Sequence, residues 1–310
     1  MSYPSIVKGN THSVQKLISA ALTLVQYLAL GLLFTVAADV RPALGQSLNW
    51  EGQTGVFVTP LAYTAASSKD GLGKPIVAFH FLNGGKVLGN FYTSSLTVGA
   101  LGRTEFGYTR DFHSQGSTTG LSNLWGNGFN SFHGKFSVLP ENVAKQKWVP
   151  AISVGFVGRS QVYNVGGWIQ GRRTNNADLY VVATKTITQT KKLPIVLNAG
   201  YKVTNASVLG LAGNAPAYRG RAFGAAAFVF KGPAKSTLIL GSEILQEPRD
   251  VQALPKAIVP TTITYAARIV PLAERKFNID FGVAQAASQI LPGVNLFARH
   301  QFALGISYGL

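Results

Sequence analysis

Ionisable side chains recur at alternate positions within apolar stretches of this chain. Ser131, His133 and Lys135 follow one another at two-residue spacing, and Phe132 and Phe136 stand between and beyond them. Successive side chains of a β-strand point to opposite faces, so these residues separate into a polar face and an apolar face. A polar face of this kind suits the lining of an interior. By this parity the candidates for lining are Arg103, Glu105, His133, Lys135, Arg159, Lys202, Glu243, Arg268, Asp280 and Arg299.

The balance of these candidates bears on what they could do. Six are Lys or Arg and three are Asp or Glu, with one histidine. A water-filled pore lined in this way would favour anions. The alternative is that the charges pair with one another and fill the interior. The sequence leaves both possibilities open.

The sequence contains few residues that could form a catalytic or metal site. Ser131 and His133 share a face and could form a nucleophile and its base, as could Ser307 and His300, but no group that would orient the base is identifiable. The five histidines show no metal-ligand spacing, and no phosphate-binding loop is present. We therefore predict no enzyme, no catalytic residue, no cofactor and no metal.

The elements that position these residues are predicted to be twelve strands. Apolar and polar residues alternate, and Gly and Pro punctuate the intervals. The connections alternate between long and short, except that the gap at 84–87 should be long and is not. The predicted strands are 75–83, 88–100, 103–113, 130–139, 149–159, 177–187, 193–204, 221–231, 236–246, 262–270, 277–286 and 297–310.

The last strand indicates the fold class. Phe302, Ile306 and Tyr308 share one face, and Ala303 and Ser307 share the other. An even number of strands, short turns alternating with longer loops and an apolar outer face are typical of an antiparallel transmembrane β-barrel. We therefore predict an all-β barrel of about twelve strands whose apolar face meets lipid. A soluble periplasmic β-sandwich is the alternative.

The N-terminal part divides differently. Lys8 and Lys16 precede an apolar run over 17–38, and small residues lie before position 46, so residues 1–45 are predicted to be a secretory signal peptide. An uncleaved membrane anchor is the alternative. Residues 46–74 are predicted to enter or plug the lumen, and residues 75–310 to form the barrel. The candidates for contact within the lumen are Gln53, Thr54, Pro60 and Tyr63.

Composition adds two limits. The chain has no cysteine, so its stability does not depend on disulfides. Its 28 Lys and Arg against 12 Asp and Glu give a net charge of +16, which permits nucleic-acid binding. However, the basic residues are dispersed along strands and turns and the leader directs export. We therefore predict no nucleic-acid partner.

Several strings of residues resemble the uncharacterised domain-of-unknown-function 3034 family of Gram-negative bacteria. They are EGQTGVFVTP with LAYT (51–64), FGYTR (106–110), LWGNGFNSFHGK (124–135), NNADLYVVATKT (175–186), TNAS (204–207) and PTTITY (260–265). The resemblance implies an outer-membrane barrel without an established activity. The stretch 55–62 is also loosely similar to the start of barrels linked to exopolysaccharide export. Leu310 departs from the terminal phenylalanine that barrel proteins usually present to the assembly machinery.

Together these observations predict a passive channel or export conduit for small polar or anionic solutes in the outer membrane. The alternatives are a plugged structural or binding barrel that is related to polysaccharide, and a lipid-acting barrel enzyme. The expected partners are outer-membrane lipid and lipopolysaccharide, the barrel-assembly machinery through the C-terminal strand, and a small anionic solute or a polysaccharide.

Overall fold

The structure is a computed structural model, and all residues that it describes belong to one unit, Pro42–Leu310. It describes residues 47–114, 116–117, 126–162, 174–187, 194–211, 213–233, 236–251, 254–258, 261–271, 276–286 and 301–310. The predicted signal peptide, Arg299 and His300 lie outside these residues. Among the described residues, no helix is long and apolar enough to cross a membrane.

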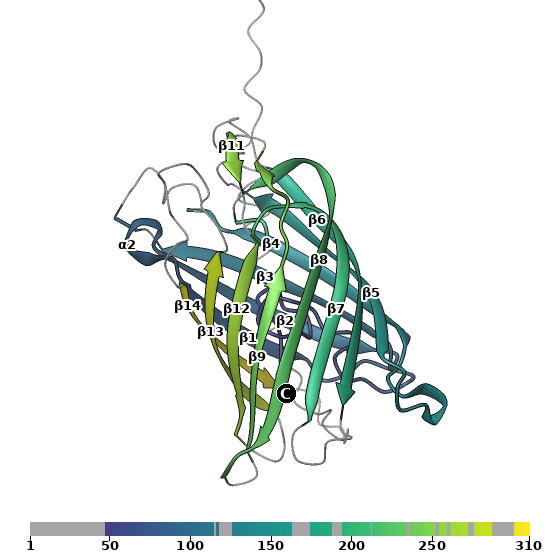
Figure 1. Cartoon of the computed structure of the whole chain (residues 1–310). Helices are drawn as coiled ribbons and strands as arrows, with labels where there is room; N and C mark the ends of the chain where they lie inside the picture. Colours follow the sequence, from purple (N-terminus) through teal and green to yellow (C-terminus); the bar gives the residue numbers. More distant parts are fainter. Residues whose placement is uncertain are drawn as a thin grey trace, which may run out of the picture. The chain divides into compact units, whose positions relative to one another are not determined.

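Twelve antiparallel strands form a closed barrel, as predicted (Figure 1). Each strand pairs with the next one along the barrel, and β1 closes the cylinder by pairing with β14, where Ala78 lies opposite Ser307. A small sheet, β10 (Asp250–Val251) with β11 (Leu254–Ile258), lies between β9 and β12 in the chain. The barrel strands are β1 (Ile76–Asn83), β2 (Asn90–Ala100), β3 (Thr104–Ser114), β4 (Phe129–Leu139), β5 (Ala151–Val162), β6 (Thr174–Ile187), β7 (Ile195–Ala206), β8 (Asn214–Lys231), β9 (Thr237–Leu245), β12 (Thr262–Val270), β13 (Phe277–Ala286) and β14 (Gln301–Gly309).

The connections distinguish the two ends of the barrel. The turn end carries the C-terminus and the connections 101–103, 140–150, 188–194, 232–236 and 271–276. The other end, here called the outer end, carries 84–89, 115–128, 163–173, 207–213, 246–261 and 287–300. The connection predicted at 84–87 is short in the structure too, although it lies at the end that carries the longer loops. A single helical turn, α2 (Gly85–Leu88), joins β1 to β2 there.

The largest boundary error concerns β8, which begins at Asn214 and not at residue 221. Its first residues extend the ladder with β7, where Asn214 lies opposite Ala206 and Arg219 opposite Thr204. This stretch lacks regular alternation of polar and apolar residues, so its sequence does not show the strand. The predicted sixteen-residue loop is therefore a short connection, 207–213, between two long strands.

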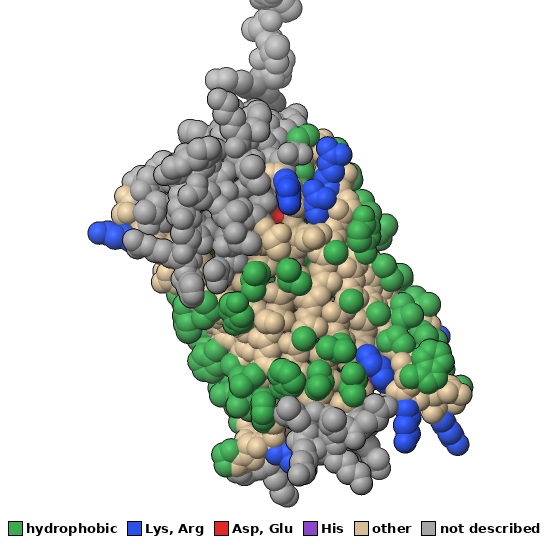
Figure 2. Space-filling view, in the orientation of Figure 1, with side chains coloured by type: hydrophobic (Ala, Val, Ile, Leu, Met, Phe, Trp, Pro, Cys, Tyr) green, Lys and Arg blue, Asp and Glu red, His purple; other side chains and the backbone are tan. Residues whose placement is uncertain are grey.

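The two faces of the barrel have opposite character. On β14, Phe302, Ile306 and Tyr308 are exposed, whereas Ala303 and Ser307 are fully buried. The same outward exposure of large apolar side chains recurs on the other strands, and Figure 2 shows these side chains spread over the barrel wall. The outer face is therefore apolar and the inner face polar, as predicted, and the closed barrel excludes the β-sandwich alternative.

The barrel interior is filled by residues 47–65, which we call the inner segment (Figure 1). Leu48, Trp50, Phe57 and Ala62 of this segment are buried, although the segment contains no strand or helix of its own. Isolated bridges join Leu48 to Thr54 and Gly55 to Pro60, so the segment is folded back on itself. The core of this protein is thus the contact between the inner segment and the polar face of the strands.

Candidate functional site

The inner segment begins with a tight reversal. Asn49 Oδ1 accepts the backbone N–H groups of Glu51 at 3.1 Å and Gln53 at 2.9 Å, and Asn49 N donates to Gln53 O at 2.7 Å. Gly52 has φ +80°, a conformation that favours glycine, and a Cβ there would lie 2.4 Å from Thr109 Oγ1. This turn directs the Glu51 side chain toward Arg159 of β5, while the Glu51 carbonyl accepts a hydrogen bond from Thr109 Oγ1 of β3 at 2.9 Å.

The first polar cluster is built around a buried ion pair. Lys135 Nζ of β4 lies 3.0 Å from Glu105 Oε1 of β3, and both side chains are buried. Glu105 also accepts the N–H of Thr54 at 3.0 Å, the N–H of Ala65 at 2.7 Å and the Thr54 hydroxyl. Lys135 Nζ donates to Thr54 O at 2.8 Å and to Tyr63 O at 2.9 Å. The pair therefore holds two turns of the inner segment against one sector of the wall.

A second cluster surrounds Arg159 of β5. Its guanidinium pairs with Glu51 of the inner segment, Nε to Oε1 at 2.7 Å, and with Asp178 of β6, Nη2 to Oδ2 at 3.0 Å. Lys202 Nζ of β7 lies 3.5 Å from Asp178 Oδ2 and 3.8 Å from Glu247 Oε1. Buried charges are costly unless they are paired. Arg159 and Lys202 share Asp178 of the wall, and Glu51 of the inner segment adds a second carboxylate for Arg159.

Glu247 lies at the outer end of this cluster, just after β9. Its side chain is buried, and its backbone carbonyl accepts a hydrogen bond from Arg221 Nε at 2.7 Å. Burial raises the pKa of the Glu247 carboxyl to about 7, and the negative charge of Asp178 acts in the same direction while Lys202 opposes it. This group therefore titrates near neutral pH.

Two further contacts are made through the backbone of the inner segment. Glu243 of β9 accepts the N–H groups of Phe57 at 3.1 Å, Val58 at 3.0 Å and Thr59 at 2.9 Å. Arg268 of β12 donates to Gly55 O at 3.0 Å and to Val56 O at 2.9 Å, and it pairs with Asp280 at 2.6 Å. One carboxylate thus binds successive N–H groups, and one guanidinium binds the carbonyls that precede them.

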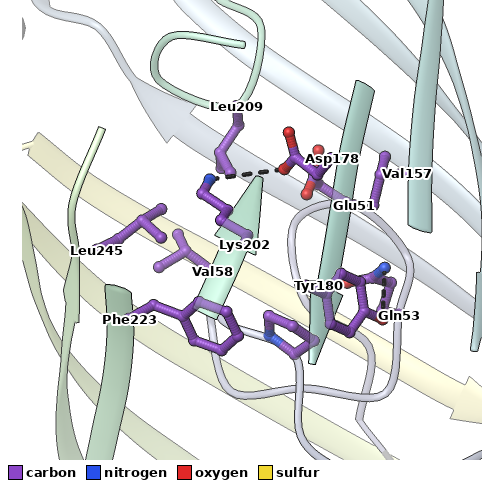
Figure 3. Close-up of a pocket in the computed structure, with 11 residues that line it drawn as sticks. Glu51, Gln53, Val58, Val157, Asp178, Tyr180, Lys202, Leu209, Phe223 and Leu245 are labelled. Carbon is purple, nitrogen blue, oxygen red and sulfur yellow. Dashed lines mark hydrogen bonds and ion pairs between the residues drawn. The ribbon is translucent and has the colours of Figure 1, made fainter. Parts of the chain in front are cut away.

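A small cavity remains between the inner segment and the wall (Figure 3). Glu51, Gln53 and Val58 face it from the segment, and Tyr180 and Phe223 face it from β6 and β8. Gln53 Nε2 donates to Tyr180 Oη at 3.0 Å across one side of the cavity. Leu209, from the connection 207–213, closes it at the outer end. The cavity lies between two parts of the segment, Glu51 with Gln53 and Val58 with Pro60.

The structure places most of the predicted lining residues on the inner face. Glu105, His133, Lys135, Arg159, Lys202, Glu243 and Asp280 are buried there, and Arg268 is half-buried. The prediction that Arg103 lines the interior is wrong. Arg103 lies in the exposed turn between β2 and β3, one residue before β3 begins. The placement of Arg299 is not described.

The predicted contact residues of the inner segment all meet the wall. Thr54 binds Glu105 and Gln53 binds Tyr180, as described above. Pro60 O accepts a hydrogen bond from Asn198 Nδ2 of β7 at 3.1 Å. Tyr63 Oη donates to Glu141 Oε2 at 2.9 Å at the turn end.

Sequence reasoning missed several acidic residues of the interior. Asp111 shares parity with Glu105 on β3, and Asp178 shares parity with Tyr180 and Thr184 on β6, so alternation could have found both. With them, and with Arg221 of β8, which lies opposite Lys202, the described inner wall carries five buried or half-buried acidic side chains, Glu105, Asp111, Asp178, Glu243 and Asp280, and five basic ones, Lys135, Arg159, Lys202, Arg221 and Arg268. Among these side chains the two signs are equal in number, so the described part of the wall does not show the expected excess of positive charge.

The candidate nucleophile and base do not form a pair. Ser131 Oγ donates to Asp111 Oδ2 at 3.4 Å, whereas His133 Nε2 lies 3.9 Å from Glu105 Oε1. Both side chains are buried inside the barrel, away from its apolar outer face. Within the described residues, no group of three or more His, Cys, Asp or Glu side chains could hold a metal ion.

Comparison with known proteins places the chain in a family. A model described as protein of unknown function (DUF3034) matches residues 44–265, most of the barrel and the whole inner segment. The chain belongs to the DUF3034 family. No curated protein matches it.

Solved structures with similar folds are outer-membrane barrels. The KdgM porin is 10% identical over 76% of this chain and 99% of its own, with a TM-score of 0.44. The NanC porin is 10% identical over 76% and 100%, with a TM-score of 0.45. The COG4313 outer membrane channel from Pseudomonas putida F1 is 12% identical over 82% and 100%, with a TM-score of 0.47. This DUF3034 member has in common with them a closed β-barrel fold.

Proposed function

We propose that this protein is an outer-membrane conduit that its own inner segment keeps closed. The single observation behind the proposal is the anchoring of residues 47–65 inside a closed barrel whose outer face is apolar. An apolar belt on a closed barrel suits a bilayer, since each barrel strand pairs with a neighbour on both sides and the sheet has no free edge. In this conformation the lumen is filled, so passage of a solute requires the segment to move.

The contacts of the inner segment are spread around the whole wall. Hydrogen bonds from residues 47–63 reach eleven of the twelve barrel strands. The partners on the wall are His80, Thr97, Glu105, Lys135, Arg159, Tyr180, Asn198, Glu243, Arg268, Asp280 and Ser307. Such a distribution favours a specific closed state over a loose tail lying in a pore.

The wall that the segment covers suits small polar solutes. With the segment displaced, the five acidic and five basic side chains of the described wall would face water, together with hydroxyl and amide groups such as Thr97, Ser153 and Asn198. The near balance of charge gives no basis for strong anion selectivity, in contrast to the expectation from sequence. Export of a polysaccharide stays an alternative without a specific contact to support it.

Planar-bilayer recording tests the proposal. The test variant replaces Asn49–Tyr63 with a Gly/Ser sequence of equal length, which removes the anchoring side chains but keeps the chain continuous. The matched control makes the same replacement at Ser67–Gly71, which lies largely exposed outside the lumen. We expect a silent wild type, a silent control and a conducting test variant.

Two results would contradict the proposal. A test variant that inserts as a heat-modifiable barrel and never conducts would show that the barrel is not a conduit. A wild type that conducts as well as the test variant would show that the inner segment does not close it.

Three expectations from the sequence stay predictions. They are the leader at 1–45, the contact with the assembly machinery and the contact with lipopolysaccharide.

A further inference from the structure

The connection between β4 and β5 is an unusual feature of the turn end. Residues 142–148, which we call the lysine turn, project beyond the strands and include a short 3₁₀ helix, η2 (Val143–Lys145) (Figure 1). Asn142, Ala144 and Lys145 have φ of 58°, 54° and 62°, a region that non-glycine residues rarely occupy. Hydrogen bonds within the turn fix this shape, among them Asn142 N to Val149 O at 3.1 Å.

This fixed shape presents apolar and basic groups together. Trp148 is 74% exposed and Val143 is 36% exposed, and Lys145 and Lys147 are exposed between them. The Trp148 Nε1–H is bound to Gln146 Oε1 at 3.2 Å, so the ring is oriented by the turn itself. Figure 2 shows basic and hydrophobic side chains gathered at this corner of the barrel.

Among the described residues, no free carboxylate balances the positive charge of the lysine turn. Glu141, the adjacent acidic residue, already binds Lys185 Nζ at 2.9 Å, Thr186 N at 2.7 Å and Tyr63 Oη. No described carboxylate lies within ion-pair distance of Lys145 or Lys147. A complementary ligand should therefore be anionic and should also accommodate an exposed indole.

The position of the turn identifies the ligand class. The strands that lead into it carry exposed Phe136, Val138 and Val154 on their outer faces, so the turn continues directly from the lipid-facing belt. Tryptophan prefers the boundary between hydrocarbon and headgroups, and lysine side chains extend from that boundary toward phosphate groups. An anionic bilayer surface attracts each nearby lysine by an appreciable free energy.

We propose that the lysine turn binds the headgroups of anionic phospholipids in the membrane around the barrel. Trp148 and Val143 enter the interface, and Lys145 and Lys147 pair with lipid phosphates. The inference rests on the placement of the barrel in a membrane under the proposed function, and it adds a specific lipid contact that conduction does not require.

Tryptophan fluorescence in reconstituted vesicles tests the inference. The full chain is inserted into phosphatidylcholine vesicles that also hold phosphatidylglycerol, with bromine placed near the headgroup end of the acyl chains of either lipid. The difference between wild type and Trp148→Phe isolates Trp148 among the four tryptophans. We expect Trp148 to be quenched, and several-fold more by brominated phosphatidylglycerol than by brominated phosphatidylcholine at equal mole fraction.

Charge variants make the test specific. Lys145→Gln with Lys147→Gln should abolish the preference for phosphatidylglycerol. The matched control, Lys231→Gln with Lys276→Gln, removes the same charge at the same end and should retain the preference. Insertion is scored separately by heat-modifiable migration, which tests the placement in a membrane on its own.

Three other outcomes would each overturn the inference. In an inserted barrel, a Trp148 that aqueous iodide quenches and brominated lipid does not would lie in water, which would leave an acidic protein as the occupant. Equal loss of preference in both double variants would assign the effect to overall charge. A barrel that fails to insert would refute both the lipid contact and the proposed function.

Discussion

Replacing Lys135 with methionine should release the inner segment without removing any part of it. The Lys135 ammonium is almost fully buried and has three acceptors, Glu105 Oε1 at 3.0 Å, Thr54 O at 2.8 Å and Tyr63 O at 2.9 Å. Methionine fills a similar volume but donates no hydrogen bond. The variant therefore leaves a carboxylate and two backbone carbonyls inside the barrel without their common donor.

The expected cost follows from this environment. Removing one partner of a buried ion pair destabilises a protein by about 3–5 kcal/mol, because the remaining charge is buried without compensation. The N–H groups of Thr54 and Ala65 still bind Glu105, so the lower value applies. About 3 kcal/mol corresponds to a shift of roughly a hundredfold in the ratio of docked to undocked segment.

Chymotrypsin cleavage of the reconstituted barrel measures that ratio. Trp50, Phe57 and Tyr63 are cleavage sites within the segment, and when reclosing is fast the cleavage rate follows the population of the open form. We expect Lys135→Met to be cleaved there roughly a hundredfold faster than wild type. Adding Glu105→Gln removes the orphaned charge but places an amide NH2 group against one of the donors of the segment, so it should restore part of the protection. Equal cleavage of wild type and Lys135→Met would refute the reasoning, as would a double variant that is as sensitive as the single one.

Two further predictions concern the outer end and the outer face. The pKa of Glu247 is raised from 4.5 to about 7, so its contribution to stability is complete below about pH 4.5 and is lost as the pH rises through about 7; this contribution is about 3 kcal/mol. Urea unfolding in micelles should show this loss in wild type but not in Glu247→Gln, and parallel profiles would contradict it. Phe156→Arg places a charge on the exposed face in the middle of β5 and should cost about 2–4 kcal/mol in a bilayer, whereas Phe156→Leu should cost little. Equal unfolding midpoints for these two variants would show that Phe156 does not face lipid.

The sequence predicted the barrel well because the signal for it is local. Alternation along a strand and short turns depend on neighbouring residues, so β12 and β13 were predicted with their observed bounds, 262–270 and 277–286. The prediction failed where alternation is weak. The start of β8 is defined by its pairing with β7, and Arg103 was assigned to the inner face because the predicted strand began one residue too early.

The interior was harder to predict because its contacts are not local. Nothing near Glu243 in the sequence indicates that its partners are the N–H groups of residues 57–59, which lie far away along the chain. The pairing of Arg159 with Glu51 likewise needs the tight turn at Gly52 and the closure of the barrel. Sequence parity therefore identified residues that face inward, but it did not decide whether they face water or protein.

The same charges explain why closure is specific and why opening is conceivable. Inside the filled barrel, Glu105 and Glu243 depend on N–H groups of the inner segment, and Arg159 depends on its Glu51 carboxylate. If the segment leaves, these wall groups lose partners that an apolar interior does not replace, and water must enter to solvate them. A dry intermediate is therefore the costliest arrangement. The wall should alternate between a state filled by the segment and a state filled by water, which is the physical requirement for a conduit that is either closed or open.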